Sequence, residues 1–350
     1  MMEKRTHMLV AMILLSLATG LLAGVVGAVV SENYLNDYAA SLQQAGERTL
    51  ELSAQKPRDL PGTFEEAVDN AHATLSPALV RFYALPNEAL LPGEESGFGV
   101  IVTSDGWVAT TQSAMNNDVG LHVAYVGDQA YQIARTFFDP LTDVVMVDLE
   151  ATGLPVVPFG ASDQVEGGTL AFAATSQTAI FPTAVVDAKH WIGKTSALPA
   201  EQFTTDFLLA DLFPKSGVPI VNSAGELIAV DSVPLHHVLS FIKSVIRSAE
   251  VDRVPFGASV IDLHLVKTSD ALARGFTRGD YVTAVTPGSP AGVAGLVRAD
   301  IITRFGDVTL NGHSTLAELL TSYHLGDSVQ ITVDRGGEER EITVVLGSQK

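Results

Sequence analysis

Ser-Gly-Phe-Gly-Val-Ile-Val-Thr-Ser-Asp-Gly-Trp-Val-Ala-Thr-Thr, residues 96–111, is the stretch of sequence that decides the fold. It contains two short apolar runs, Gly99–Thr103 and Trp107–Thr110, separated by the turn-forming residues Ser, Asp and Gly. Short strands separated by such residues predict an all-β barrel or sandwich, and the pattern continues to about Val233. Further runs of the same kind are Val144–Val147, Leu170–Ala173 and Leu227–Val230.

Helical patterns lie on either side of this β-rich region. Phe64–Ala73 has apolar residues at helical spacing and predicts a short amphipathic helix that leads into a strand at Leu79–Tyr83. Val238–Arg247 predicts a helix with one apolar face. From about Val254, strands alternate with a helix near Ser314–Tyr323. The sequence therefore predicts a β domain followed by a smaller α+β domain.

Composition excludes several classes of function. The chain has 350 residues, which suits two folded domains with additional segments. It contains no cysteine, which excludes disulfides, thiolate catalysis and cysteine-ligated metal sites. Its net charge of −19, without a Lys/Arg cluster, argues against nucleic-acid binding. No His/Asp/Glu cluster has metal-ligand spacing, so neither a metal nor a cofactor is predicted.

The N-terminal region predicts a membrane anchor. Met8–Val30 has no charged residue over 23 positions, which is long enough to cross the hydrocarbon core of a bilayer as a helix. Lys4 and Arg5 precede this run, while Glu32 and Asp37 follow it. The positive-inside rule then places the N-terminus in the cytoplasm. We therefore expect a single-pass protein of the cell membrane, with its domains in the periplasm or outside the cell.

A cleaved signal peptide is the alternative, because Val26-Gly-Ala28 has the small residues of a cleavage site. The length of the apolar run favours a retained anchor. Gly20, Gly24 and Ala28 recur every four residues, which would let a second transmembrane helix approach closely on that face. The simpler interpretation is that small residues are common in membrane helices.

The β-rich region resembles the HtrA (Deg) family of serine proteases. Residues 96–111 are similar to the core of the family's first barrel, which runs directly into the catalytic histidine. Asp-Pro-Leu-Thr-Asp-Val-Val-Met-Val, residues 139–147, resembles the strand that carries the catalytic aspartate. Gly153–Gly160 continues the match, and Ser-Gly-Val-Pro-Ile-Val-Asn, residues 216–222, resembles the nucleophile loop.

The C-terminal region resembles the PDZ domain of the same family. Pro255–Ala258 lies where these domains place the loop that binds a peptide carboxylate. The rest of such a domain is matched by Pro287–Ala291, Ala294–Leu296, Asp300–Ile302 and Leu325–Asp327. The resemblance covers about Thr63 to Gly347.

The resemblance implies a mainly β fold, in which a trypsin-like double β-barrel domain and a C-terminal α+β PDZ domain follow the N-terminal transmembrane helix. The expected organisation is a cytoplasmic tail (1–7), a transmembrane helix (8–30), a helical segment and linker (31–62), a trypsin-like domain (63–250) and a PDZ domain (254–348).

The family motif places the catalytic positions on residues that cannot complete a triad. The acid position falls on Asp143 and the nucleophile position on Ser216, but the base position falls on Ser113. A serine hydroxyl cannot act as a base near neutral pH, so nothing takes the proton from Ser216. We therefore interpret Asp143 and Ser216 as structural relics.

The oxyanion site is also altered. Family members donate a backbone N–H from the residue two positions before the nucleophile, and here that residue is Pro214, which has none. The interval from Asp206 to Ser216 is two residues longer than the family's usual spacing, and Val218 replaces a glycine. The sequence therefore predicts a loop that lacks the catalytic shape.

A relocated base would need to reach Ser216 by a hydrogen bond. Lys215 is adjacent, but consecutive side chains on an extended segment point apart, which argues against a Ser–Lys dyad. Four histidines are further candidates, and each is interpreted more simply as a surface or loop residue: His122, His190, His236 and His237.

Phe256, Gly257 and Ala258 are the predicted peptide-binding residues. A PDZ domain binds an extended peptide by adding it as a strand to the edge of a sheet. Gly257 lies where backbone N–H groups approach the peptide carboxylate, whereas Ala258 replaces a larger aliphatic residue of the family. Retained peptide binding and a purely scaffolding role are therefore both open.

These features predict a membrane-anchored pseudoprotease outside the cytoplasm that binds proteins or peptide C-termini as an adaptor, a chaperone-like factor or a sensor. A structural subunit of a membrane protein complex is the first alternative. A weak serine endopeptidase is the second.

Overall fold

The computed structural model describes residues 61–85, 93–116, 122–192, 197–251, 253–312 and 314–347. Within the chain, Ser53–Lys350 forms one compact unit. The expected cytoplasmic tail, the transmembrane helix with Gly20, Gly24 and Ala28, and residues 31–60 of the expected helical segment lie outside the described residues. Among the residues that are described, no helix is long and apolar enough to cross a membrane.

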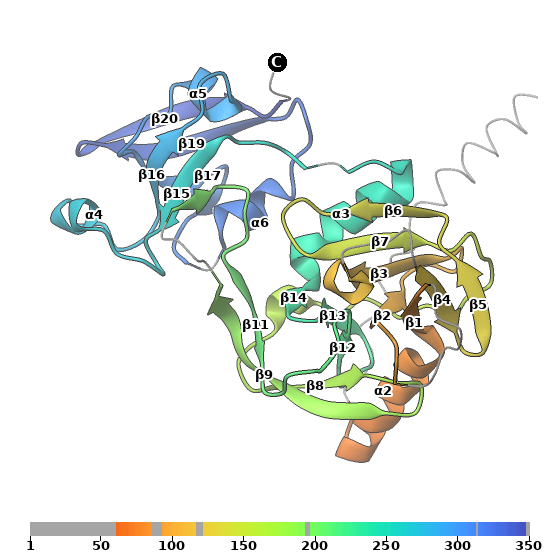
Figure 1. The fold of residues 1–350 in the computed structure, drawn as a ribbon. Coiled ribbons are helices and arrows are strands. Elements are labelled where there is room, and N and C mark those ends of the chain that lie inside the picture. The colour runs from red at the N-terminus through yellow and green to blue at the C-terminus, as the bar shows by residue number, and fades with distance from the viewer. Residues whose placement is uncertain are drawn as a thin grey trace, which may run out of the picture. The chain divides into compact units, whose positions relative to one another are not determined.

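The first sheet is antiparallel and has seven strands in the order β5-β4-β1-β2-β3-β7-β6 (Figure 1). Its central strands are buried on both faces, as the continuous apolar runs of the sequence predict. The strands are β1 (Leu79–Ala84), β2 (Gly97–Ile101), β3 (Trp107–Thr111), β4 (His122–Val126), β5 (Gln129–Gln132), β6 (Arg135–Phe138) and β7 (Val144–Asp148).

Residues 96–111 contain the hairpin of β2 and β3, in which Gly99 pairs with Thr110. Two glycines of β2 are required by close packing. A Cβ atom at Gly97 would overlap Ala114, and one at Gly99 would lie 2.8 Å from Val108 Cγ1. Gly97 therefore lets the short helix η1 (Ser113–Met115), which follows β3, approach the sheet.

The second sheet has six strands in the order β11-β9-β8-β12-β13-β14. Its apolar residues join those of the first sheet in one hydrophobic core. The strands are β8 (Thr169–Ala174), β9 (Ile180–Trp191), β11 (Thr205–Leu209), β12 (Pro219–Asn222), β13 (Leu227–Val230) and β14 (Val233–Pro234).

Two helices pack against this core. Helix α2 (Phe64–Ala78) begins at Thr63, whose hydroxyl accepts the Glu66 N–H at 3.1 Å, and it continues past the predicted end at Ala73. Helix α3 (Leu235–Ser248) follows Pro234 and begins three residues before the predicted start. The expected apolar face of α3 is buried in the common core.

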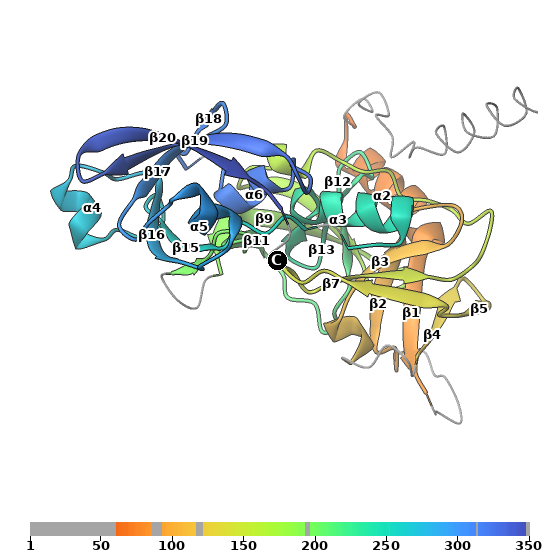
Figure 2. The same cartoon turned by 90° about the horizontal axis from the view of Figure 1, so that it is seen from above.

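The C-terminal sheet has the order β10-β15-β16-β17-β19-β20, and its long hairpin of β19 and β20 is prominent in both views (Figures 1 and 2). A separate apolar cluster lies beneath it. The elements are β15 (Ala258–Asp262), α4 (Ser269–Ala273), β16 (Asp280–Val285), α5 (Pro290–Ala294), β17 (Ile301–Phe305), β18 (Val308–Thr309), α6 (Leu316–Leu320), β19 (Ser328–Arg335) and β20 (Glu338–Val345).

Strand β10 (Leu198–Pro199) comes from the preceding region of the chain, between β9 and β11, yet it pairs with β15 in the C-terminal sheet. Nothing in the sequence pattern predicted this pairing.

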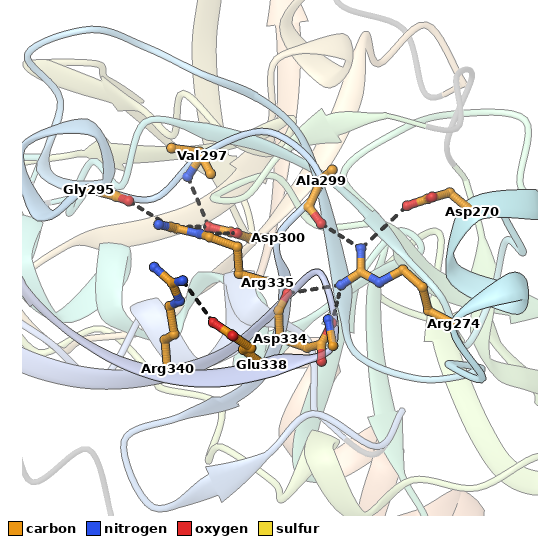
Figure 3. A network of polar contacts seen from close by, with 11 residues as sticks. Asp270, Arg274, Gly295, Val297, Ala299, Asp300, Asp334, Arg335, Glu338 and Arg340 are labelled. Atoms are coloured by element: carbon orange, nitrogen blue, oxygen red, sulfur yellow. Dashed lines mark hydrogen bonds and ion pairs between the residues drawn. The ribbon is translucent and has the colours of Figure 1, made fainter.

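A polar network stabilises the C-terminal sheet (Figure 3). The carboxylate of Asp300 is fully buried and accepts two hydrogen bonds from the Arg335 guanidinium, each at 2.7 Å, and a third from the Val297 N–H. Arg274 joins the Ala299 carbonyl to Asp334. The two hydrogen bonds from Arg335 compensate for the free-energy cost of burying the Asp300 charge, and they fix the loop before β17.

Candidate functional site

Ser113 and Asp143 meet at the ends of neighbouring strands. The pairing of Thr111 with Val144 brings the residues that follow β3 next to those that precede β7. The Ser113 hydroxyl donates a hydrogen bond to Asp143 Oδ2 at 2.7 Å, and the Gln112 N–H donates to the Asp143 carbonyl at 2.8 Å. The structure therefore brings together the residues that the sequence assigned to the base and acid positions.

Ser216, at the predicted nucleophile position, lies on the extended segment before β12. Its carbonyl accepts the Phe98 N–H at 2.9 Å, and a bridge joins it to Gly97 of β2. Gly217 has a φ of +79°, and a Cβ atom there would overlap the Phe98 carbonyl. No hydrogen bond joins the Ser216 hydroxyl to another of the described residues.

Asp231 was missed by the sequence analysis. Its two carboxylate oxygens accept the N–H groups of Gly217 and Val218, at 2.7 and 2.8 Å. Burial raises the pKa of Asp231, against the opposing effect of these two hydrogen bonds. Asp231 follows β13 as a single acidic residue with a φ of +52°, and no local motif reveals that it holds a loop more than ten residues earlier.

The segment that precedes Ser216 is held by a lysine. Lys215 Nζ donates to the Gly93 carbonyl at 2.8 Å and lies 2.9 Å from Glu95 Oε2. Lys215 is therefore engaged with the segment before β2, as expected from the argument against a Ser–Lys dyad. Pro214 is exposed immediately before it.

The four candidate histidines occupy different places. His190 is exposed on β9, whereas His122 is buried at the start of β4 opposite Ala84. The interpretation as a surface or loop residue is therefore wrong for His122, and also for His237, which is buried in α3. His236 and His237 begin α3.

The two histidines of α3 have their own partners. The His236 ring is bonded through Nδ1 to the Ser162 hydroxyl at 2.9 Å. The buried His237 ring stacks on Phe203 with ring centres 4.1 Å apart. The Nε2 atoms lie 3.7 Å (His236) and 3.5 Å (His237) from Oε1 of Glu318 in α6. These two imidazoles are therefore part of a different cluster and not of the Ser216 site.

In the C-terminal sheet, the N–H groups of Phe256 and Gly257 converge on one acceptor. That acceptor is Glu201 Oε1, at 2.5 and 2.6 Å. Gly257 has a φ of +80°, and a Cβ atom there would overlap the Ser289 side chain. The loop that contains Phe256 and Gly257 therefore binds a side-chain carboxylate of the same chain.

The residues just before Glu201 lie along β15. Leu198 pairs with Val260 and Pro199 with Ser259, in antiparallel register, and the Ala200 N–H donates to the Ala258 carbonyl at 2.8 Å. The Ala200 side chain is 2% exposed and belongs to the apolar cluster of the C-terminal sheet. Sequence reasoning missed this segment because its contacts are with residues more than 50 positions away.

Comparison with known proteins gives consistent results for both regions. Residues 254–346 match the PDZ domain family. "Putative serine protease HhoB" of Synechocystis sp. is 26% identical over 72% of this chain and 66% of its own length. A "Probable periplasmic serine endoprotease DegP-like" of Chlamydia trachomatis is 28% identical over 76% of this chain and 58% of its own length. The chain thus spans less than two thirds of the length of these relatives.

Among solved structures, "HtrA-type protease AlgW with tripeptide" has a TM-score of 0.57 and 20% sequence identity. The match covers 80% of this chain and 96% of that one. At this identity the likeness shows the fold: mainly β, with a trypsin-like domain and a PDZ domain, as the sequence predicted.

Proposed function

Since this chain belongs to the HtrA family of trypsin-like serine proteases with a C-terminal PDZ domain, we propose that it is a member without proteolytic activity that binds proteins or peptides outside the cytoplasm. The observation that carries the proposal is the hydrogen bond from the Ser113 hydroxyl to Asp143. The acid of the expected triad thereby orients a hydroxyl and not an imidazole.

Of the proposed defects, the absence of a base should lower turnover the most. The Ser113 hydroxyl donates a hydrogen bond to Asp143, and the oxygen of a hydroxyl is not basic enough to deprotonate Ser216. Removing the base from a triad that acts as one unit lowers turnover by roughly 10⁶-fold. A weak endopeptidase would need another base within hydrogen-bond reach of Ser216.

The loop before Ser216 supports the same proposal for a separate reason. Pro214 has no N–H to donate to an oxyanion, and loss of one such donor lowers turnover by roughly 10²–10³-fold. The neighbouring Lys215 ties this loop to Glu95, which opposes a change in its shape.

Binding of proteins or peptide C-termini is the proposed activity that remains. The N–H groups of Phe256 and Gly257 already converge on a carboxylate, which supports recognition of a C-terminus by Phe256, Gly257 and Ala258. Such a site would suit an adaptor, a chaperone-like factor or a sensor. The relatives named as periplasmic support a place outside the cytoplasm, with residues 8–30 proposed as the single-pass anchor.

A structural subunit of a membrane complex is the second candidate. It is favoured by one observation, namely that Ala200 and Glu201 of the same chain already occupy the groove beside β15. A subunit of this kind would not need to bind free peptides.

The test has two parts. Turnover of a fluorogenic casein is measured for the unmodified protein and for Ser216→Ala, and the two rates are expected to be equal. A rate that is higher in the unmodified protein would overturn the assignment as a pseudoprotease. Purification from the native membrane in mild detergent then separates the candidates, because a structural subunit would remain stoichiometric with fixed partners whereas an adaptor would not.

A further inference from the structure

The segment 198–201 contacts the PDZ groove in the three ways in which such a domain holds a peptide ligand. It adds a short antiparallel strand to β15. It places a small apolar side chain, that of Ala200, in the apolar cluster of the domain. It presents a carboxylate oxygen, from Glu201, to the N–H groups of Phe256 and Gly257. Strand addition gives affinity, and side-chain pockets with carboxylate capture give specificity.

The carboxylate comes from a side chain because the chain continues beyond Glu201 into β11. Phe203 is buried against His237 of α3, so the residues after Glu201 leave the groove toward the trypsin-like domain. The segment is therefore covalently continuous with one domain while it occupies the ligand groove of the other.

We propose that residues 198–201 are a built-in ligand that closes the PDZ groove, and that a peptide with a free C-terminal carboxylate binds by displacing them. This proposal rests on the peptide-binding function proposed above. An intramolecular ligand competes at an effective concentration in the millimolar range. The apparent affinity of an external peptide is then reduced by the fraction of molecules in which the groove is open.

Glu201→Ala tests the proposal directly, because it removes the carboxylate that Phe256 and Gly257 bind and leaves the backbone of the segment unchanged. Glu166→Gln is the matched control, since Glu166 is an exposed acid whose side chain does not contact the groove. The probe is an equimolar mixture of fluorescein-labelled decapeptides that end in Ala, Val, Leu or Phe with a free carboxylate. The same peptides with an amidated C-terminus measure binding that does not depend on the carboxylate.

Fluorescence anisotropy is expected to show at least tenfold tighter binding of the free-carboxylate peptides to Glu201→Ala than to the unmodified protein. Glu166→Gln should bind like the unmodified protein, and amidated peptides should show no gain. Equal affinity of Glu201→Ala and the unmodified protein for free-carboxylate peptides would overturn the built-in ligand while peptide binding itself stands.

If no peptide binds to any variant, hydrogen exchange of the Gly257 amide still tests the built-in ligand, because this amide donates to Glu201. Loss of its protection in Glu201→Ala, with the protection of β19 and β20 retained, supports the built-in ligand even if the peptide-binding function fails. Unchanged protection of Gly257 overturns it. Thermal unfolding of each variant shows whether the PDZ domain is intact.

A second inference comes from the cluster of His236, His237 and Glu318. One ligand atom from each residue lies within 4.8 Å of the other two. Tetrahedral ligands about 2.0–2.1 Å from a Zn²⁺ ion are roughly 3.3 Å apart, close to the 3.5 and 3.7 Å between the Nε2 atoms and Glu318 Oε1. Two imidazoles and one carboxylate are a ligand set that Zn²⁺ uses, with a fourth position left open.

The surrounding contacts orient two of these ligands. The Ser162 hydroxyl is bonded to Nδ1 of His236, which turns Nε2 toward Glu318. The Thr315 N–H donates to Glu318 Oε2 at 2.9 Å and leaves Oε1 directed at the imidazoles. From this arrangement we infer a zinc site that joins α3 of the trypsin-like domain to α6 of the PDZ domain.

Isothermal titration of the chelator-treated full chain with ZnCl₂ tests this site. We expect one Zn²⁺ per chain at micromolar affinity or tighter, and at least tenfold weaker binding for His236→Gln and for Glu318→Gln. Glutamine at position 318 can still serve the capping box with Thr315, so α6 is preserved. His190→Gln, which removes an exposed histidine, is the matched control. Absence of binding, or equal binding by all variants, would overturn the inference.

Discussion

At the scale of single residues, Asp206 has a carboxyl whose ionisation should limit stability. Burial raises its pKa from 3.8 to about 6, against the opposing effects of the Ser232 hydroxyl and His190. Because the pKa is higher in the folded state, folding favours the protonated form. The protonated Asp206 carboxyl therefore makes its full contribution to the free energy of unfolding below about pH 4. That contribution is lost as the pH rises through about 6.

Asp206→Asn is therefore expected to stabilise the protein at pH 7.5 by about 2–3 kcal/mol and to have little effect at pH 4. Urea denaturation of both proteins at pH 4, 5, 6 and 7.5 measures the difference. Two stability curves that run parallel over this range would show that the ionisation of Asp206 does not influence folding.

Ser113→His tests whether a histidine at the proposed base position would by itself allow proteolysis. Asp143 lies in position to orient an imidazole, since it already accepts the Ser113 hydroxyl at 2.7 Å. We nevertheless expect no measurable turnover of fluorogenic casein, because Pro214 still supplies no N–H to the oxyanion. Ser113→His with Ser216→Ala is the blank. Activity above that blank would show that the proline is tolerated.

The family resemblance assigned Ser113 and Asp143 to the base and acid positions, and the structure brings the two side chains into contact. The sequence did not predict the roles of Asp231 or Glu201. Both residues use a side-chain carboxylate to hold backbone N–H groups of a distant loop, 13 and 14 positions away for Asp231 and 55 and 56 for Glu201. Such bonds depend on the tertiary fold and leave no periodic signal in the sequence.

At the scale of elements, the loop before β15 depends on the shape of Gly257. Its φ is +80°, and a Cβ atom would overlap Ser289, whose hydroxyl also donates to the Gly257 carbonyl at 3.1 Å. Gly257→Ala should therefore lower the free energy of unfolding by roughly 2–4 kcal/mol, through backbone strain and the steric overlap together.

Gly288→Ala is the matched control for that substitution. Gly288 has a similar φ of +79°, but no atom lies within 4 Å of the position of a Cβ. We expect Gly288→Ala to lower the free energy of unfolding by about 1 kcal/mol, through backbone strain alone. Chemical denaturation of the two variants measures the difference. Equal losses would mean that the contact with Ser289 does not constrain the loop.

Six strands of the trypsin-like domain were predicted to within a few residues, because each coincides with a short apolar run of the sequence. They are β1, β2, β3, β7, β8 and β13. The ends of the helices were predicted less accurately. Helix α2 includes Pro77 in its last turn, where the prediction had already stopped at Ala73. Strand β10 was not predicted at all, since two residues form a strand only by pairing with β15.

At the scale of the whole molecule, the predicted topology follows from the charges that flank residues 8–30. Lys4 and Arg5 precede the uncharged run, so the folded domains are expected outside the cytoplasm. A protease added to intact cells with a permeable outer layer should digest the domains before lysis. A cytoplasmic protein in the same cells is the control for lysis. Complete protection of the domains until the cells are lysed would contradict this orientation.

The same experiment, extended by fractionation, separates a retained anchor from a cleaved leader. A retained helix of 23 uncharged residues should keep the full-length chain in the membrane fraction after an alkaline carbonate wash. Cleavage after Ala28 would instead release a shorter chain, and mass spectrometry of the N-terminal peptide would identify it. Replacing Ala28 by Leu is expected to leave the chain length unchanged if the helix is retained. A longer chain in that variant than in the unmodified protein would show that residues 1–28 are normally removed.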